Sequence, residues 1–248
     1  MMTLIRRHPF LYSSVVILIL WSLMHFIAAW PFIPSPIKTL GFILTHAILL
    51  LSHLSISLLR VFTSILLAVF VGGLTGIIIA KNKKADQWIT PLVYALYPVP
   101  KIAFLPIIML LFGLGNTSKV ILIYLILFFQ ITLSVRDSVH HIHPLYYLSI
   151  KSLGADKKDV YRHVVMPAIL PNLFTTLRIS IGTAISVLFF AENYATKYGI
   201  GYFIMDQWLK MNYSGMFAGI IVIGTMGVAL FLLLDYLEKK FCPWKAKT

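Results

Sequence analysis

The sequence is poor in cysteine and in charged residues, and both shortages limit what the protein can be. Cys242 is the one cysteine in 248 residues, so neither an internal disulfide nor a cluster of thiolate metal ligands is available. Only 12% of the residues are charged, whereas soluble domains have about 25%. The chain therefore carries too little charge to cover a surface that faces water.

Long apolar runs take the place of the missing charge. Hydrophobic residues make up 59% of the chain, and its mean hydropathy is +0.89. A transmembrane helix needs about 20 mostly apolar residues. We therefore expect an all-α integral membrane protein with about six transmembrane helices, at residues 11–30, 61–80, 88–112, 120–135, 171–194 and 211–234.

The first apolar run has two interpretations. Arg6 and Arg7 precede it, as basic residues precede the apolar core of a secretory signal peptide. The run 11–30 is longer than such a core, and Trp30-Pro31-Phe32 is a poor cleavage site. The sequence therefore favours a first helix that is retained.

Acidic residues are scarce: 8 Asp and Glu stand against 21 Lys and Arg, a net charge of +13. A basic excess suits nucleic-acid binding, but it also suits a membrane protein, whose cytoplasmic loops gather Lys and Arg. With the N-terminus inside, four cytoplasmic segments hold 14 of the 21: Arg6, Arg7, Lys81, Lys83, Lys84, Arg136, Lys151, Lys157, Lys158, Arg162, Lys239, Lys240, Lys245 and Lys247. This bias predicts that both termini are cytoplasmic and accounts for the charge without a nucleic acid.

Three parts of the chain are expected. Residues 1–53 hold the first helix, a rigid extended piece at 33–36 and an apolar helix at 37–54 along the outer surface. Residues 54–238 form the main transmembrane domain, in which 195–210 is a short outer loop. Residues 239–248 form a basic cytoplasmic tail.

The cytoplasmic segment 136–170 is too charged to span and too apolar for an ordinary loop. Pro144, after His143, suits the first turn of a helix, and Gly154 suits its end. Asp156 can cap a second helix, which Pro167 is expected to stop before a span that begins near Pro171. The pattern predicts a short helix at 144–153, a glycine and a second short helix.

Apolar residues surround the first of these short helices. They are Leu145, Tyr146, Tyr147, Leu148, Ile150 and Leu153. An exposed apolar surface of this kind usually marks a contact. Two interpretations stay open from the residues alone: packing against the protein's own helix ends, or docking of a soluble partner.

One motif of the cytoplasmic segment is Ser152-Leu153-Gly154-Ala155 with the later Pro167 and Pro171. The other motifs, in chain order, are Ile33-Pro34-Ser35-Pro36, Tyr97-Pro98-Val99-Pro100, the stretch 112–119, Leu177-Arg178, Ala191-Glu192 and Gly199-Ile200-Gly201-Tyr202. Together they resemble the permease subunits of bacterial and archaeal ATP-binding cassette importers, in the branch that serves nitrate, sulfonates, taurine and thiamine precursors, and the first motif resembles the cytoplasmic-loop signature of that family. The resemblance covers most of the chain.

The resemblance implies a type I permease fold in the cytoplasmic membrane, with a cytoplasmic coupling helix on which ATPase subunits dock. It implies two ATPase subunits, a second permease subunit that is a copy of this chain, and an external solute-binding protein as partners. ATP and Mg belong to the ATPase, and this chain is expected to bind no cofactor or metal and to be no enzyme. The implied docking residues are Tyr147, Leu148, Ser149, Ile150, Ser152, Leu153, Gly154, Ala155, Pro167 and Pro171.

One position departs from the family pattern. The acidic residue that begins the loop signature in the family is Leu148 here. Docking would then depend on apolar packing and on close approach of backbone at Gly154.

Charges within the predicted spans are expensive and usually paired or functional. Glu192 and Arg60 both lie toward the outer ends of their spans, so we predict an ion pair that is either structural or part of the solute path. Arg178, nearer the inner side, is expected to reach the membrane interface with its long side chain rather than to contact solute.

The third span is interrupted by prolines. Tyr97, Pro98, Pro100 and Lys101 mark a place where freed backbone groups can line a pathway, although simple kinking is the alternative. Gly72 and Gly76 form a small-residue pair that suits helix packing.

Two rival classes of membrane protein fit the sequence less well. A secondary transporter or channel usually carries several intramembrane ionisable groups, whereas Glu192 stands nearly alone here. A membrane enzyme needs a catalytic constellation, and the sequence has no phosphate-binding glycine loop and no paired intramembrane aspartates. The sequence therefore predicts a permease subunit whose solute it does not reveal.

Overall fold

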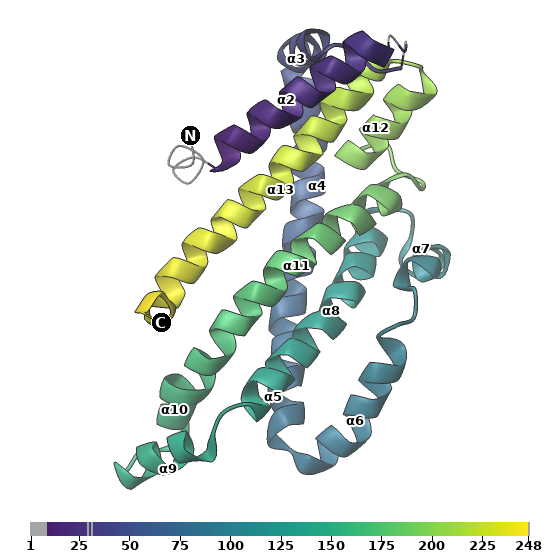
Figure 1. Cartoon of the computed structure of the whole chain (residues 1–248). Coiled ribbons are helices and arrows are strands. Elements are labelled where there is room, and N and C mark those ends of the chain that lie inside the picture. The colour runs from purple at the N-terminus through teal and green to yellow at the C-terminus, as the bar shows by residue number, and fades with distance from the viewer. Residues whose placement is uncertain (1–8, 29, 31, 248) are drawn as a thin grey trace.

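The computed structural model describes residues 9–28, 30 and 32–247, and within these residues every regular element is a helix. Four helices are long and apolar enough to cross a membrane. They run alongside one another through the length of the molecule (Figure 1). Their bounds are Ala47–Lys81 (α4 Ala47–Leu67, η1 Ala68–Gly72 and α5 Gly73–Lys81), Asn116–His140 (α8), Lys157–Glu192 (α10 Lys157–Val160, η3 Tyr161–Val165 and α11 Met166–Glu192) and Tyr213–Phe241 (α13). The prediction of an all-α membrane protein is confirmed.

The proline-rich stretch forms a broken element instead of one straight helix. Helix α6 (Lys83–Leu96) is followed by η2 (Lys101–Phe104) and α7 (Leu105–Phe112), and the two halves are bent by 84°. Pro98 and Pro100 lie in the break, where their missing N–H groups and fixed φ end the first helix. The described residues thus contain four spans, or five with this bent pair counted. Helix α2 (Pro9–Ala28) corresponds to the first predicted span. Its apolar part, Ser14–Ile27, is shorter than the four long helices, so the count of six spans stays a prediction.

The two ends of the molecule are built differently. At one end lie α9 (Pro144–Ser152), α10 and the turn between α5 and α6; we call this the α9 end (Figure 1). At the other lie α3 (Pro36–Thr45) and α12 (Ile200–Leu209), which we call the α12 end. A short η4 (Pro243–Lys247) follows α13.

The structure ends three elements near the α12 end and the C-terminus at other residues than the sequence suggested, and the division of the chain into three parts stays a prediction. Helix α3 ends at Thr45, so residues 47–54 belong to the long helix and not to an outer surface helix, and the boundary at 53/54 falls inside α4. Residues 200–209 form helix α12 and not an open loop. The tail predicted from 239 begins inside α13, which continues to Phe241.

Pro167 does not end a helix, contrary to prediction. The N–H of Met166 donates to the Tyr161 carbonyl five residues back, as in a π-helix, and Pro167 next to it has no N–H to donate. A π-turn relieves the crowding that a proline causes in a regular α-helix. The chain therefore continues through Pro167 and Pro171 as one helix to Glu192.

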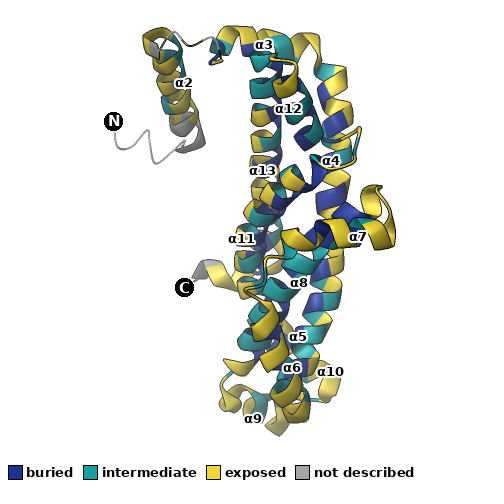
Figure 2. Ribbon diagram, turned by 90° about the vertical axis from the view of Figure 1, so that its right-hand side faces the viewer, coloured by how far each residue is buried: buried dark blue, intermediate teal, exposed yellow. Residues whose placement is uncertain are grey.

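Helix α8 is the centre of the core, packed between α4–α5 and α11. Leu122, Ile123, Leu127 and Ile131 on α8 are fully buried. Buried residues follow the inner sides of α4 and α8, whereas α7 and α9 are largely exposed (Figure 2). The four apolar helices therefore form the core that supports the elements at each end.

Gly72 and Gly76 bring α5 close to α8, as their spacing suggested. A Cβ added to Gly76 would lie 2.6 Å from the Thr132 carbonyl oxygen, and one added to Gly72 would lie 3.1 Å from the Phe128 carbonyl oxygen. Only hydrogen atoms fit between these backbones.

Gly76→Ala is expected to destabilise the protein by about 1–3 kcal/mol, because the added methyl group forces the two helices apart. Gly73→Ala is the matched control, since a Cβ there meets nothing within 4 Å and alanine favours the helix. Thermal unfolding in detergent measures both. Equal unfolding temperatures for the two variants would contradict the close contact.

Candidate functional site

Helix α9 forms as its local sequence predicts. The His143 side chain accepts a hydrogen bond from the Leu145 N–H, and Pro144 occupies the first turn. Gly154 follows with φ +81°, a conformation that glycine adopts without strain. Asp156 then caps α10 through a reciprocal pair of side-chain bonds with Asp159. The predicted helix, glycine and second helix are confirmed, with α9 one residue shorter than expected.

No residue of α9 is buried. Leu145 and Leu148 are each 61% exposed, and Leu153 just after the helix is 85% exposed. Tyr147, by contrast, packs against the core, and this burial raises the pKa of its phenol. One side of α9 thus anchors the helix to this protein, and the other presents apolar side chains at the tip of the molecule (Figure 2).

The remaining predicted docking residues lie in two places. Ser149 and Ser152 are exposed on α9, where their hydroxyls donate to carbonyls of the helix itself. Ala155 closes the turn by donating its N–H to the Ile150 carbonyl. Pro167 and Pro171 are half-buried and are part of the long helix that ends at Glu192, outside α9 itself.

A cavity of about 470 Å³ separates α9 from the long helix and the C-terminal segment. His141, His143 and His163 line it together with Pro167 and Trp244. No group of three or more His, Cys, Asp or Glu in the described part of the chain is arranged to hold a metal ion.

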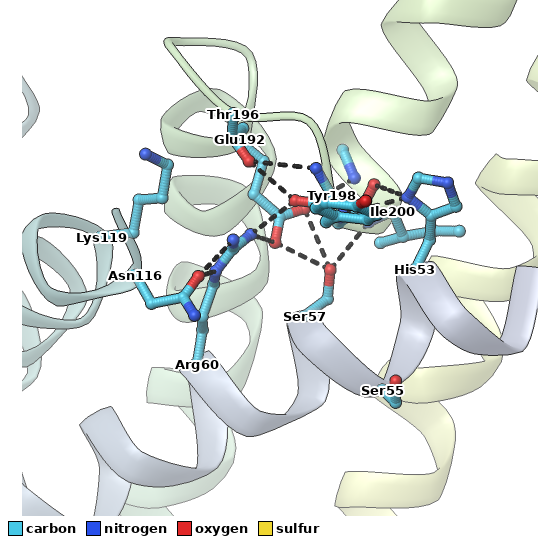
Figure 3. Close-up of polar contacts among 12 residues, drawn as sticks. His53, Ser55, Ser57, Arg60, Asn116, Lys119, Glu192, Thr196, Tyr198 and Ile200 are labelled. Carbon is cyan, nitrogen blue, oxygen red and sulfur yellow. Dashed lines mark hydrogen bonds and ion pairs between the residues drawn. The ribbon is translucent and has the colours of Figure 1, made fainter. Parts of the chain in front are cut away.

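Arg60 and Glu192 meet in a buried polar network at the α12 end (Figure 3). The Arg60 Nη1 lies 2.6 Å from the Glu192 Oε1, and their side chains are 3% and 0% exposed. The other Arg60 nitrogens donate to the Asn116 Oδ1 at 2.6 and 2.9 Å. The sequence suggested this pair, and the structure brings it together away from solvent.

The Glu192 carboxylate also holds the first turn of α12. It accepts hydrogen bonds from the Ser57 hydroxyl at 2.8 Å and from the Gly201 N–H at 2.8 Å. The Ser57 hydroxyl oxygen in turn accepts from the Ile200 N–H at 2.8 Å. A carboxylate suits this position, because free N–H groups and the helix dipole favour negative charge at a helix N-terminus.

Two glycines allow this close approach. A Cβ on Gly199, whose φ is +127°, would lie 2.4 Å from the Glu192 Cδ. A Cβ on Gly201 would lie 3.0 Å from the backbone of Phe189. The motif at 199–201 is therefore explained by the packing of α12 onto α4 and α11.

Sequence analysis missed several members of this network. His53 lies four residues before Ser57, and Ser57 lies three residues before Arg60, so all three share one side of α4. The His53 Nδ1 lies 3.1 Å from the Gly199 N. Lys119, in the first turn of α8, is fully buried and donates to the carbonyls of Leu114 and Gly115 at 3.0 and 3.3 Å. Helical periodicity could have found the first two, whereas the burial of Lys119 depends on packing.

Arg178 forms ion pairs within the protein, and its position at the membrane interface stays a prediction. Its guanidinium lies 2.7 Å from the Asp235 carboxylate and also pairs with Glu238, both on α13. Lys245 completes the cluster by pairing with Glu238 at 2.7 Å. Glu192 is thus not the only acidic residue inside a long helix, since α13 extends through Asp235 and Glu238. This cluster joins α11 to the C-terminal part of α13.

Tyr97, Pro98, Pro100 and Lys101 lie at the break between α6 and α7. The Lys101 ammonium donates to the Leu96 carbonyl at 2.7 Å and to the Tyr97 carbonyl. Beside it is a cavity of about 360 Å³, lined by Tyr97, Val99, Lys101, Ile102, Ile126, Gln130, Ser186, Val187 and Phe190. The break therefore bends the chain and also borders a cavity.

Comparison with known proteins shows the family of this chain. The sequence profile described as "binding-protein-dependent transport system inner membrane component" matches residues 72–241. The chain therefore belongs to this family, the permease subunits of ATP-binding cassette importers.

Curated relatives span nearly the whole chain. The taurine transport system permease protein TauC of Escherichia coli (strain K12) is 32% identical over 220 residues, which are 86% of this chain and 80% of that protein. The formylaminopyrimidine transport permease protein ThiX of Halalkalibacterium halodurans is 27% identical over 235 residues, 94% of each chain. A nitrate import permease of Synechococcus elongatus is 29% identical over 191 residues, 76% of this chain and 68% of that protein.

The fold is shared with solved permeases. An inward-facing structure of the MetNI methionine ABC transporter superposes with a TM-score of 0.64 at 16% identity, covering 80% of this chain and 97% of that one. The chain is thus a multi-pass membrane permease subunit of an importer, with the fold predicted from its sequence.

Proposed function

We propose that this chain and a second copy of it form the path through which a small solute is imported. An external binding protein delivers the solute, and two separate ATPase subunits supply the energy. ATP and Mg would bind to those subunits, and this chain would bind no cofactor. The observation that carries the proposal is the apolar exposed side of α9, held on a helix that is itself anchored to the core through Tyr147.

Docking at α9 follows from its position and its chemistry. The helix is at the tip of the α9 end, and its free side chains are Leu145, Leu148 and Leu153. A soluble partner with an apolar cleft would bury them. A movement of that partner would then be passed through α9 to α8, which precedes it in the chain, and to the long helix of α10 and α11, which follows it. With Leu148 where the family has an acidic residue, apolar packing supplies the contact.

The orientation follows from charge. Lys81, Lys83, Lys84, Lys157 and Lys158 all lie at the α9 end, and cytoplasmic segments collect basic residues. The α9 end and both termini would therefore be cytoplasmic. The α12 end would face the binding protein.

The solute class is proposed from the relatives. Their names specify taurine, aliphatic sulfonates, nitrate and formylaminopyrimidine. All are small polar molecules, and we propose a solute of this kind.

Uptake into proteoliposomes tests the function. With the binding protein, the ATPase and this permease together, we expect uptake of radiolabelled taurine, ethanesulfonate or nitrate that requires ATP. Leaving out the ATPase should stop uptake. Uptake driven by an ion gradient alone would support the rival secondary transporter and contradict an importer subunit.

A further inference from the structure

The cavity at the α6–α7 break has a distinct charge pattern. Lys101 is its one charged lining residue, and among the described residues that line it there is no Asp or Glu. Most of the other walls are apolar, formed by Val99, Ile102, Ile126 and others. A charge acts more strongly on a nearby ion where apolar walls exclude water. The cavity is therefore favourable for an anion and unfavourable for a cation.

The Lys101 ammonium retains donor capacity. An ammonium group has three N–H donors, and two of them bind the carbonyls of Leu96 and Tyr97. Its other close contacts are two aromatic rings, with the Nζ 4.8 Å from the centroid of Phe129 and 5.4 Å from that of Tyr97. No carboxylate of the described chain pairs with Lys101, so its charge is held in place without being neutralised.

Gln130 supplies further donors at the same cavity. Its carbonyl oxygen accepts a hydrogen bond at 2.8 Å from the hydroxyl of Ser180, which is fully buried. That bond orients the amide and leaves its NH₂ group, with two donors, for a molecule in the cavity. Ser186 on α11 lines the same space, so α8, α11 and the α6–α7 break all contribute.

The place and size of the cavity suit a solute in transit. Figure 1 places the α6–α7 connection beside α8, between the two ends of the molecule. Irregular backbone at such depth is tolerated where it lines a cavity, and broken helices commonly contribute to solute sites in transporters. A volume of about 360 Å³ accommodates a molecule of a few heavy atoms.

We propose that this cavity is a binding site for the solute in transit, that the solute carries a sulfonate, nitrate or similar anionic group, and that Lys101 and Gln130 are its ligands. The inference rests on the proposed import function and names the charge of the solute. Selection for anions would then lie in the membrane path itself, in addition to any selection by the external binding protein.

Direct binding of a small anion tests the site. Full-length permease in complex with its ATPase, in nanodiscs and without the binding protein, is titrated with labelled ethanesulfonate and, separately, with labelled ethylammonium of similar size. We expect ethanesulfonate to bind and ethylammonium not to bind. Lys101→Gln should weaken ethanesulfonate binding about tenfold or more, as expected for loss of a charged hydrogen bond, whereas Lys101→Arg should remain within a few-fold of the parent.

Two further variants make the result specific. Gln130→Glu keeps Lys101 but replaces the two amide donors with a negative charge, so it should also abolish ethanesulfonate binding. If Lys101→Gln fails to assemble with the ATPase, Gln130→Glu still tests whether the cavity binds ethanesulfonate. Lys197→Gln removes the same charge from an exposed position in the α11–α12 loop and should bind like the parent.

The proposal would be overturned by equal binding of ethylammonium, or by Lys101→Gln and Gln130→Glu binding ethanesulfonate as the parent does. The uptake assay is run in parallel with the same proteins. ATP-dependent uptake together with unchanged binding in the variants would reject the anion site and leave the import function standing. Absence of ATP-dependent uptake of every solute would instead reject the import function.

Discussion

Glu192→Ala is expected to destabilise the protein by about 3–5 kcal/mol, the usual cost of leaving one member of a buried ion pair alone. Arg60, only 3% exposed, would lose its carboxylate partner. The N–H of Gly201 and the hydroxyl of Ser57 would lose their acceptor at the same time. Thermal unfolding of the purified protein, and the yield of folded protein in detergent, measure the loss.

A paired substitution separates charge from packing. In Arg60→Met/Glu192→Leu no charge is left unpaired, and buried ion pairs replaced by apolar residues are often no less stable. We expect the double variant to recover part of the stability that Glu192→Ala loses, although Asn116 and the first turn of α12 stay without their partners. If Glu192→Ala unfolds at the parent's temperature, the network does not hold α12 in place.

Gly154→Val is expected to abolish association with the ATPase while the protein still inserts into the membrane. The φ of +81° at Gly154 is unfavourable for a β-branched residue, and a bulky side chain would be added beside the exposed Leu153. Co-purification of the ATPase with the membrane-extracted permease measures the association.

The chain offers a matched control for this variant. Gly113, between α7 and α8, has the same φ of +81°, and a Cβ at either glycine meets nothing within 4 Å. Gly113→Val therefore also forces a β-branched residue into a positive φ, at a place remote from α9. It should keep the ATPase bound, and equal loss of ATPase from both variants would show that strain alone, and not a docking role of Gly154, explains the effect.

Local features of the coupling region were predictable from the sequence because they depend on neighbouring residues. His143-Pro144 begins α9, Gly154 ends it, and Asp156 begins α10. Such capping signals act over three or four residues. The end predicted at Pro167 failed because the π-turn at Tyr161–Val165 accommodates the proline, and that turn has no clear signal of its own.

The partners of buried charges were less predictable, because they come from helices far apart in the chain. Arg60 and Glu192 could be paired from their depth in two spans, but Asn116 on α8 and the N–H of Gly201 on α12 join them only after four elements pack together. The ion partners of Arg178 were not predictable for the same reason. Its partners Asp235 and Glu238 are reached only when α13 crosses α11.

The sequence by itself determined the class of protein, the helical content and the short helix at 144–152, because hydropathy and capping are local properties of the chain. Tertiary structure decided which charges are paired, that Lys119 is buried, and that the α6–α7 break opens onto a cavity with one uncompensated lysine. These depend on distances between helices, and the close packing set by residues such as Gly72, Gly76 and Gly199 fixes those distances only in the folded protein.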